Sequence, residues 1–201
     1  DGETHQGIFD LSYLGNIPNM SIFAPKNDVE LSEGLKFGLL DYNGPFAIRY
    51  PRGTACDKFH EFNEDIVYGK SEIMYMEKDI ALLAVGSMVE IASDVRDMLK
   101  SKGYNVSLIN ARFVKPIDIT VLHECAINHS LLVTMEENVY TGGFGEVVCH
   151  YVDEACLDIK VLNISLPDDY IEHGNVSILR AEAGIDAQSV CDRIESFYEN
   201  I

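Results

Sequence analysis

Short apolar runs alternate with amphipathic segments along most of this chain, and this alternation constrains the fold more than any other feature of the sequence. The apolar runs have the length of buried strands and lie at residues 80–85, 106–109, 131–135 and 161–164. A segment with helical periodicity follows each run, and in residues 88–102 one face carries Val89, Ala92, Val95 and Leu99. Strands and helices that alternate four times predict a complete doubly wound α/β sheet over residues 69–201.

Residues 1–53 predict a smaller strand–helix–strand unit. The strands are expected at residues 17–24 and 46–50, and Asn27 or Asp28 can cap the helix between them. The apolar stripe of this helix would consist of Leu31, Leu35 and Leu39. Such a βαβ fragment is too small to close a core alone. Residues 54–68 have no convincing periodicity and are interpreted as a linker, so the predicted fold is α/β with a partial unit joined to a complete one.

The glycine-rich turn at residues 142–145 lies between a predicted strand and a predicted helix, where a backbone can approach a phosphate. As a G-x-G-x-x-G sequence it lacks the third glycine, because Val148 occupies that position, and no P-loop lysine follows. We therefore interpret it as a tight turn that lets a helix pack closely on the sheet.

Charge and cysteine content exclude several classes of partner. The formal net charge of −18 and the pI near 4.5 argue against nucleic acid and anionic membranes, which both need a positive surface. The five cysteines include no C-x-x-C pair, which fits a reducing cytoplasm and argues against a disulfide framework or a zinc knuckle. No signal peptide is predicted, and the longest apolar run is too short to span a bilayer. We predict a cytoplasmic protein.

Asp1, Glu3 and His5 are the first candidates for chemistry. A histidine beside carboxylates can donate or accept a proton near neutral pH. Their spacing matches no regular metal motif, so no metal ligand is assigned. On composition alone, a solvated loop with an incidental histidine is the favoured interpretation.

Arg49 and Arg52 flank Tyr50 and Pro51 at the end of a predicted strand. Ligands gather at the carboxyl ends of strands in open α/β sheets, and arginine suits bidentate phosphate binding. In a chain with 33 acidic and 15 basic residues, both arginines can equally pair with carboxylates. The residues alone do not decide between phosphate binding and such pairing. Glu136 and Glu137 also follow a predicted strand. Adjacent acids point in different directions, so structural capping or a subunit contact is the favoured role for them.

Seven segments, in the expected order, resemble the 1-deoxy-D-xylulose-5-phosphate synthase family, whose members are transketolase-like thiamine-diphosphate enzymes. The segments are DGETHQGIFD (1–10), IPNM (17–20), YPRG (50–53), ARFVKPID (111–118), EEN (136–138), GGFG (142–145) and LPD (166–168). The first and the fourth are the more specific. The glycine turn and the paired glutamates also occur in transketolases and in the β subunits of 2-oxo acid dehydrogenases.

The resemblance implies a reaction in which pyruvate and glyceraldehyde 3-phosphate condense with loss of CO2, with thiamine diphosphate and Mg²⁺ as cofactors. The product would be 1-deoxy-D-xylulose 5-phosphate, a precursor of isoprenoids, thiamine and pyridoxal. By position, Asp1 and His5 match residues that contact the substrate, with His5 as proton donor or oxyanion partner. Arg52 matches the arginine that holds the phosphate of the aldehyde, and Arg49 is the second candidate.

The resemblance also divides the chain. Residues 1–53 are similar to the C-terminal portion of a pyrimidine-binding domain, and residues 69–201 to a transketolase C-terminal domain. The Gly-Asp-Gly metal and diphosphate motif of the family is absent from this sequence. We therefore expect the chain alone to be inactive and to bind no thiamine diphosphate with useful affinity, and we expect the complete enzyme to be a homodimer. Alternatives are the C-terminal half of a split transketolase, a 2-oxo acid dehydrogenase β subunit, or a non-catalytic interaction domain.

Overall fold

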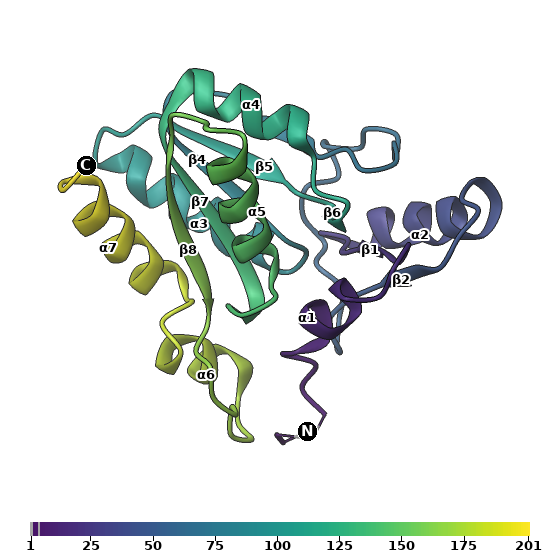
Figure 1. Cartoon of the computed structure of the whole chain (residues 1–201). Helices are drawn as coiled ribbons and strands as arrows, with labels where there is room; N and C mark the ends of the chain where they lie inside the picture. Colours follow the sequence, from purple (N-terminus) through teal and green to yellow (C-terminus); the bar gives the residue numbers. More distant parts are fainter. Residues whose placement is uncertain (1, 4) are drawn as a thin grey trace.

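A five-stranded sheet forms the centre of the larger unit (Figure 1). The computed structural model describes residues 2, 3 and 5–201. The strand order is β3-β5-β4-β7-β8, in which β3 runs antiparallel to β5 and all other neighbours are parallel. The strands are β3 (Glu72–Tyr75), β4 (Asp79–Ala84), β5 (Val106–Asn110), β7 (His129–Val139) and β8 (Lys160–Leu166). The winding changes direction at β4, because β5 is added on one side of it and β7 on the other. The predicted doubly wound α/β class is confirmed.

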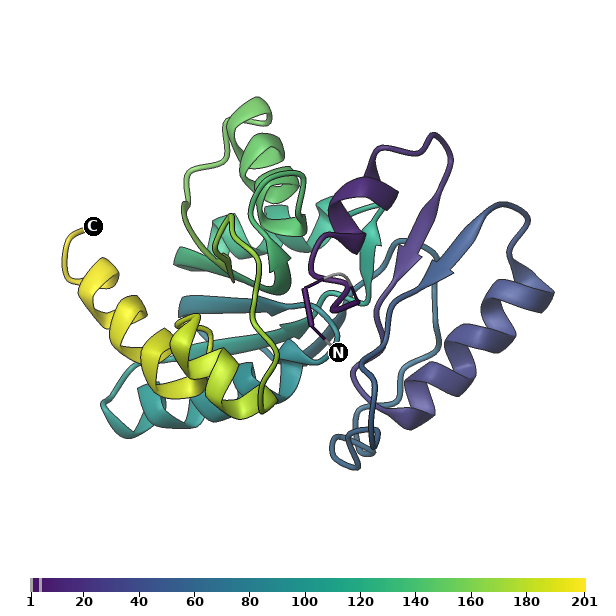
Figure 2. The ribbon, with the colours of Figure 1, turned by 90° about the horizontal axis from the view of Figure 1, so that it is seen from below.

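Helices cover both faces of this sheet (Figure 2). They are α3 (Met88–Ser101) and α7 (Ala187–Tyr198) on one face, and α4 (Ile119–Asn128) and α5 (Phe144–Glu154) on the other. Alternate residues of β4 enter two separate cores: Ile80 and Leu82 pack with α3 and α7, whereas Ala81 and Leu83 pack with α4 and α5. A parallel sheet needs this cover, since both of its faces are apolar.

Several helices lie where their apolar faces and capping residues predicted them. The four residues predicted to form the buried face of α3 are all fully buried, and Gly103 follows this helix with φ +97°, a conformation that glycine adopts readily. The side chain of Asp118 accepts the N–H groups of Thr120 and Val121 and so caps α4, and Asn27 caps α2 (Asp28–Lys36) through the Glu30 N–H. A short helix, α6 (Val176–Glu182), follows β8.

The smaller unit contains the predicted βαβ arrangement. Strands β1 (Ser21–Phe23) and β2 (Phe46–Ile48) are parallel and are connected by α2 and a π-helical turn, η1 (Phe37–Asp41). A third strand, β6 (Phe113–Lys115), follows β5 of the larger unit and pairs antiparallel with β1. The sequence predicted neither β6 nor β3. Because β6 completes the order β2-β1-β6, the two units are joined through a shared sheet.

The smaller unit differs from the sequence-based expectation at three places. The strand predicted at residues 17–24 is shortened by a turn in which the Met20 N–H donates to the Ile17 carbonyl oxygen. Residues of the first segment form helix α1 (Asp10–Gly15), where no element was predicted. Leu35 and Leu39 are 47% and 80% exposed and form no buried stripe. Gly34 faces the sheet instead, so closely that a Cβ there would lie 2.4 Å from the Phe23 ring.

Residues 49–71 contain turns but no helix or strand, and the predicted linker lies within them. Across the described part of the chain, no helix combines the length and the apolar character that a membrane crossing requires.

Candidate functional site

The first segment of the chain is held against the larger unit. The Val139 N–H donates to the Ile8 carbonyl oxygen at 3.0 Å, and the Ile8 side chain is buried in the core beside α3. The Gln6 Nε2 amide donates to the Glu172 carbonyl oxygen at 3.0 Å. These contacts fix the segment at the carboxyl end of the larger sheet, where ligands bind in many α/β proteins.

His5 lies just before this anchored stretch. Its backbone N–H donates to the Gly2 carbonyl oxygen at 3.1 Å. A surface hollow of about 520 Å³ lies nearby and is lined by Gly2, Glu3, Glu172 and His173. Asp1, the other residue predicted to be catalytic, lies outside the described residues, and its role stays a prediction.

Asn138 fixes α1 at the end of β7. Its Oδ1 accepts the Leu11 N–H at 3.2 Å, and its Nδ2 donates to Ser12 Oγ at 2.8 Å and to the Val139 carbonyl oxygen at 2.7 Å. Asn138 is fully buried, so these partners meet the requirement that a buried amide be hydrogen-bonded. No role was predicted for Asn138, and its only signal in the sequence was the EEN segment of the family resemblance.

Arg49 and Arg52, the two arginines predicted to bind phosphate, have different environments. The Arg49 side chain is 14% exposed, and its Nη2 donates to the Glu137 carbonyl oxygen at 3.0 Å. Its Nη1 lies 3.8 Å from Glu137 Oε2. Arg49 is therefore shielded and already paired with Glu137. Arg52 is exposed. The structure therefore brings Arg49 onto the larger unit and places Arg52 at the surface.

Glu137 also binds two groups of the larger unit. Arg180 from α6 donates from Nε to Oε1 at 2.9 Å and from Nη2 to Oε2 at 3.2 Å. Ser87, between β4 and α3, donates to Oε2 at 2.8 Å. Burial alone would raise the pKa of Glu137, but Arg180, Arg49 and Ser87 outweigh it and lower the pKa. Nothing in the sequence signalled Ser87 or Arg180.

Glu136 points to the other side of β7 and has a structural role. Its two carboxylate oxygens accept the N–H groups of Phe144 and Gly145, each at 2.8 Å, and so cap α5. Burial raises the pKa of Glu136 to about 7, against the opposing effect of these two donors. A Cβ at Gly143 would lie 2.7 Å from both oxygens, and one at Gly145 would lie 1.8 Å from Asn163 Nδ2. The glycine turn therefore permits close helix packing, as predicted.

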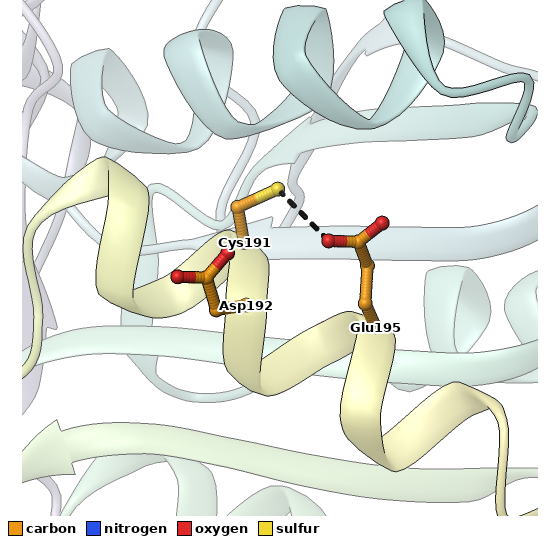
Figure 3. Close-up of side chains that lie close together, drawn as sticks. All are labelled: Cys191, Asp192 and Glu195. Atoms are coloured by element: carbon orange, nitrogen blue, oxygen red, sulfur yellow. Dashed lines mark hydrogen bonds between the residues drawn. The ribbon is translucent and has the colours of Figure 1, made fainter.

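One cluster among the described residues has the composition of a metal site: Cys191, Asp192 and Glu195 of α7, with ligand atoms within 4.8 Å of one another (Figure 3). The Lys102 ammonium already lies there, 2.5 Å from Glu195 Oε2 and 3.7 Å from Cys191 Sγ. Burial raises the pKa of the Cys191 thiol, which disfavours the thiolate that a metal binds. The cluster is an ion pair around Lys102 and does not fit a metal centre.

The surface hollow lined by Gly2, Glu3, Glu172 and His173 does not fit the diphosphate end of thiamine diphosphate. A bound diphosphate and its Mg²⁺ need cationic or N–H donors together with oxygen ligands. These four residues include no lysine or arginine. Two carboxylates at this position would repel a diphosphate.

Comparisons with known proteins give a consistent result. The family "Transketolase, pyrimidine binding domain" matches residues 1–57, and the family "Transketolase, C-terminal domain" matches residues 69–190. A solved structure described as a split gene transketolase in an inactive β4 tetramer has a TM-score of 0.89 and 26% sequence identity. That likeness covers 97% of this chain and 63% of the solved chain.

The most similar curated relatives that were found belong to one group of enzymes within this family. The chain is 47% identical to the 1-deoxy-D-xylulose-5-phosphate synthase of Lachnoclostridium phytofermentans and 44% identical to that of Dictyoglomus turgidum. The alignments cover 96% and 100% of this chain but only 31% and 32% of those synthases, so the chain spans about a third of their length. The chain belongs to the transketolase family and is similar, over nearly its whole length, to 1-deoxy-D-xylulose-5-phosphate synthases.

Proposed function

We propose that this chain supplies substrate-contacting residues of a 1-deoxy-D-xylulose-5-phosphate synthase. The complete enzyme would condense pyruvate with glyceraldehyde 3-phosphate, with loss of CO2, to give 1-deoxy-D-xylulose 5-phosphate. One observation carries the proposal: the consecutive residues Glu137 and Asn138 hold the segment that leads to Arg52 and the segment that follows His5. Both predicted substrate-binding segments therefore start from one place on the larger unit.

Within this proposal each residue has a distinct role. His5 donates a proton to the oxygen that becomes charged when the new carbon–carbon bond forms, and Asp1 contacts the substrate beside it. Arg52 binds the phosphate of the aldehyde through its planar guanidinium, which matches phosphate oxygens. Arg49 is assigned to Glu137 instead, because its guanidinium is shielded and already paired.

Thiamine diphosphate and Mg²⁺ are proposed to bind other parts of the complete enzyme. Leu35, Leu39 and Leu40 form an exposed apolar face on α2 and η1, and β2 is the edge strand of its sheet. Apolar surface and open strand edges of this kind are usually covered by another part of the protein. We propose that the remainder of a pyrimidine-binding domain covers them, in a cytoplasmic homodimer.

A second arrangement is favoured by the structural neighbour. That protein is described as a split gene transketolase, and this chain matches 63% of its solved chain with a TM-score of 0.89. The same residues could therefore work in a separate subunit that joins a second chain. Co-purification with a chain that carries a Gly-Asp-Gly motif would distinguish this arrangement from a single polypeptide.

Replacing Arg52 with alanine tests the proposal in the complete enzyme. Loss of a charge-assisted hydrogen bond to phosphate should raise the KM for glyceraldehyde 3-phosphate about 10- to 100-fold. The KM for pyruvate should change little, because pyruvate carries no phosphate. Steady-state kinetics with each substrate varied in turn would measure both values. Arg193→Ala, at an exposed position of α7, is the control. Equal effects on the two substrates would remove Arg52 from the phosphate site.

Replacing His5 with alanine should lower kcat about 10²- to 10⁴-fold, the range typical of a lost general acid. The KM values should change much less, because the proton is transferred only in the transition state. Glutamine at the same position should not restore turnover, since an amide does not titrate near neutral pH. Unchanged turnover in the alanine variant would show that His5 is not a catalytic residue.

A further inference from the structure

Glu137 lies at the position where many doubly wound sheets bind their ligand, but protein groups already fill that position. Such a crevice forms between the two strands at which the winding changes, here β4 and β7. Ala84 at the end of β4 pairs with Met135 of β7. Glu137 follows Met135 on β7 and accepts a hydrogen bond from Ser87. Arg49 of the smaller unit enters this crevice. The crevice therefore docks one unit of the chain on the other.

The contacts around Glu137 are largely shielded from water, and Arg49 meets this residue at two points, 3.8 Å from its carboxylate and through a hydrogen bond to its carbonyl oxygen. The side chains of Glu137, Arg49 and Arg180 are 17%, 14% and 24% exposed. Ion pairs on an open surface contribute little, but pairs shielded from water and supported by hydrogen bonds hold a defined geometry. The Arg49 backbone is fixed too, because its N–H donates to the Phe23 carbonyl oxygen at 2.8 Å.

Arg49 is an anchored residue shortly before Arg52. Arg52 comes three residues after Arg49, so their α-carbons lie at most about 11 Å apart, and Pro51 between them has a restricted φ. A shift of Arg49 is therefore passed on to Arg52. We propose that Glu137, acting through Arg49, is a positioning residue for Arg52, and that Arg180 and Ser87 orient Glu137. This inference rests on the proposed phosphate-binding role of Arg52.

The test compares two acceptors in the complete enzyme, glyceraldehyde 3-phosphate and unphosphorylated glyceraldehyde. Glu137→Gln keeps the size of the side chain but weakens the attraction to both arginines. The preference for the phosphorylated acceptor, as the ratio of kcat/KM values, should fall about tenfold, since displacement of a binding group by about 1 Å can have effects up to a hundredfold. The loss should appear in the KM for glyceraldehyde 3-phosphate, with kcat nearly unchanged.

The matched control is Glu77→Gln. Glu77 also binds two cations, Arg96 and Lys100, and its side chain is 22% exposed, but these contacts lie within the larger unit. The control should leave the acceptor preference unchanged. If Glu137→Gln does not fold, Ser87→Ala removes a single hydrogen bond to Glu137 and should shift the preference in the same direction, about two- to threefold.

A double-mutant cycle between Glu137→Gln and Arg52→Ala completes the test. If Glu137 acts through Arg52, the loss from Glu137→Gln should disappear once Arg52 is alanine. Additive losses, or equal losses for both acceptors, would overturn the positioning role and leave the proposed function intact. If Arg52→Ala itself does not change the acceptor preference, the phosphate role of Arg52 fails, and the positioning role fails with it.

Discussion

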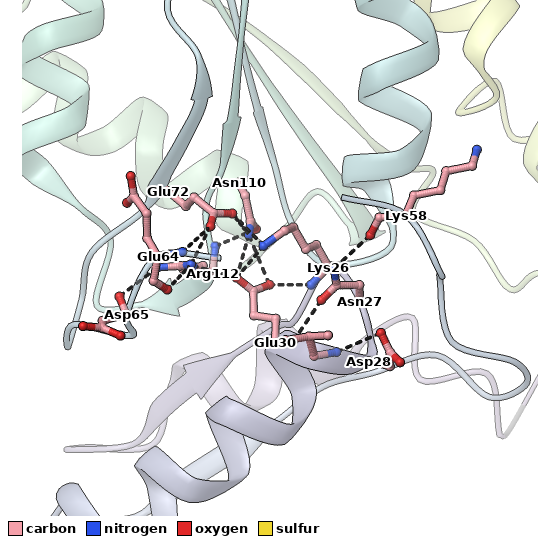
Figure 4. A network of polar contacts seen from close by, with 11 residues as sticks. Lys26, Asn27, Asp28, Glu30, Lys58, Glu64, Asp65, Glu72, Asn110 and Arg112 are labelled. Atoms are coloured by element: carbon pink, nitrogen blue, oxygen red, sulfur yellow. Dashed lines mark hydrogen bonds and ion pairs between the residues drawn. The ribbon is translucent and has the colours of Figure 1, made fainter. Parts of the chain in front are cut away.

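Replacing Arg112 with methionine is expected to lower the free energy of unfolding by about 3–5 kcal/mol, because it removes one partner from a fully buried ion network. Arg112 Nε lies 2.6 Å from Glu30 Oε1, and its Nη2 lies 2.7 Å from Glu72 Oε1 (Figure 4). Lys26 Nζ lies 3.3 Å from Glu30 and 2.7 Å from Glu72. These four side chains are at most 3% exposed. Without Arg112, two buried carboxylates would share one cation.

Urea unfolding followed by circular dichroism would measure this effect. Arg193→Met is the matched control, because Arg193 is exposed on α7, and it should change stability by no more than about 0.5 kcal/mol. Adding Glu72→Gln to Arg112→Met restores charge balance with Lys26 and should recover part of the loss. If Arg112→Met were no more harmful than Arg193→Met, the network would not be a major source of stability.

The same network predicts how stability changes in acid. Burial would raise the pKa of Glu72, but hydrogen bonding to Lys26 and the charge of Arg112 outweigh it and lower the pKa. In acid the unfolded state, with a glutamate pKa of about 4.3, therefore binds the proton more readily than the folded state. This contribution is present above about pH 4.3 and is lost as the pH falls through the folded-state pKa. The contribution should be smaller in Arg112→Met, where the pKa of Glu72 is lowered less.

Elements that depend on local signals could be predicted from the sequence. Helix α3 has a complete apolar face, and Asp118 and Asn27 cap their helices through neighbouring N–H groups. Strand β6 could not be predicted, because its partner β1 lies about ninety residues earlier in the chain and three residues carry no clear periodicity. The Leu35 and Leu39 stripe failed for another reason: periodicity does not show which face of a helix meets the sheet, and Gly34 makes that contact.

In the candidate site, too, the residue types could be predicted from the sequence but their contacts could not. Arg49 and Arg52 are equivalent by composition and spacing, and the contact of Arg49 with Glu137, 88 residues away, sets Arg49 apart. Arg112 lay within a segment that resembled the synthases, but its partners Glu30 and Glu72 are 82 and 40 residues distant. Sequence reasoning can name residue types suited to a task, whereas their assignment depends on contacts that only the fold creates.

Phe113, at the start of β6, joins the two units through apolar contacts. It follows Arg112, whose φ of +55° is uncommon for a residue with a side chain. The ring of Phe113 is 1% exposed and lies edge-on to Phe23 and Tyr68, with centroids 5.1 and 5.7 Å apart. Phe37 is a further neighbour, at 6.2 Å. One strand from the larger unit therefore inserts an aromatic ring into the core of the smaller unit.

Phe113→Ala should lower the free energy of unfolding by about 3–5 kcal/mol, the usual effect of removing a fully buried ring. The smaller unit should be affected most, because the ring of Phe113 packs against its Phe23, Phe37 and Phe46 rings. Urea unfolding would measure the total loss. Limited proteolysis within residues 49–71, which contain no helix or strand, would report whether the smaller unit detaches first.

The informative control is Phe62→Ala, which removes the same ring from a partly exposed position beside Tyr75. It should destabilise the protein much less, because water already reaches part of the ring and no closed cavity forms. If both variants lost equal stability, the cluster around Phe113 would not be the main apolar joint. If Phe113→Ala lost more but cleavage in residues 49–71 stayed as slow as before, Arg112 and its ion network would be holding the smaller unit in place without the ring.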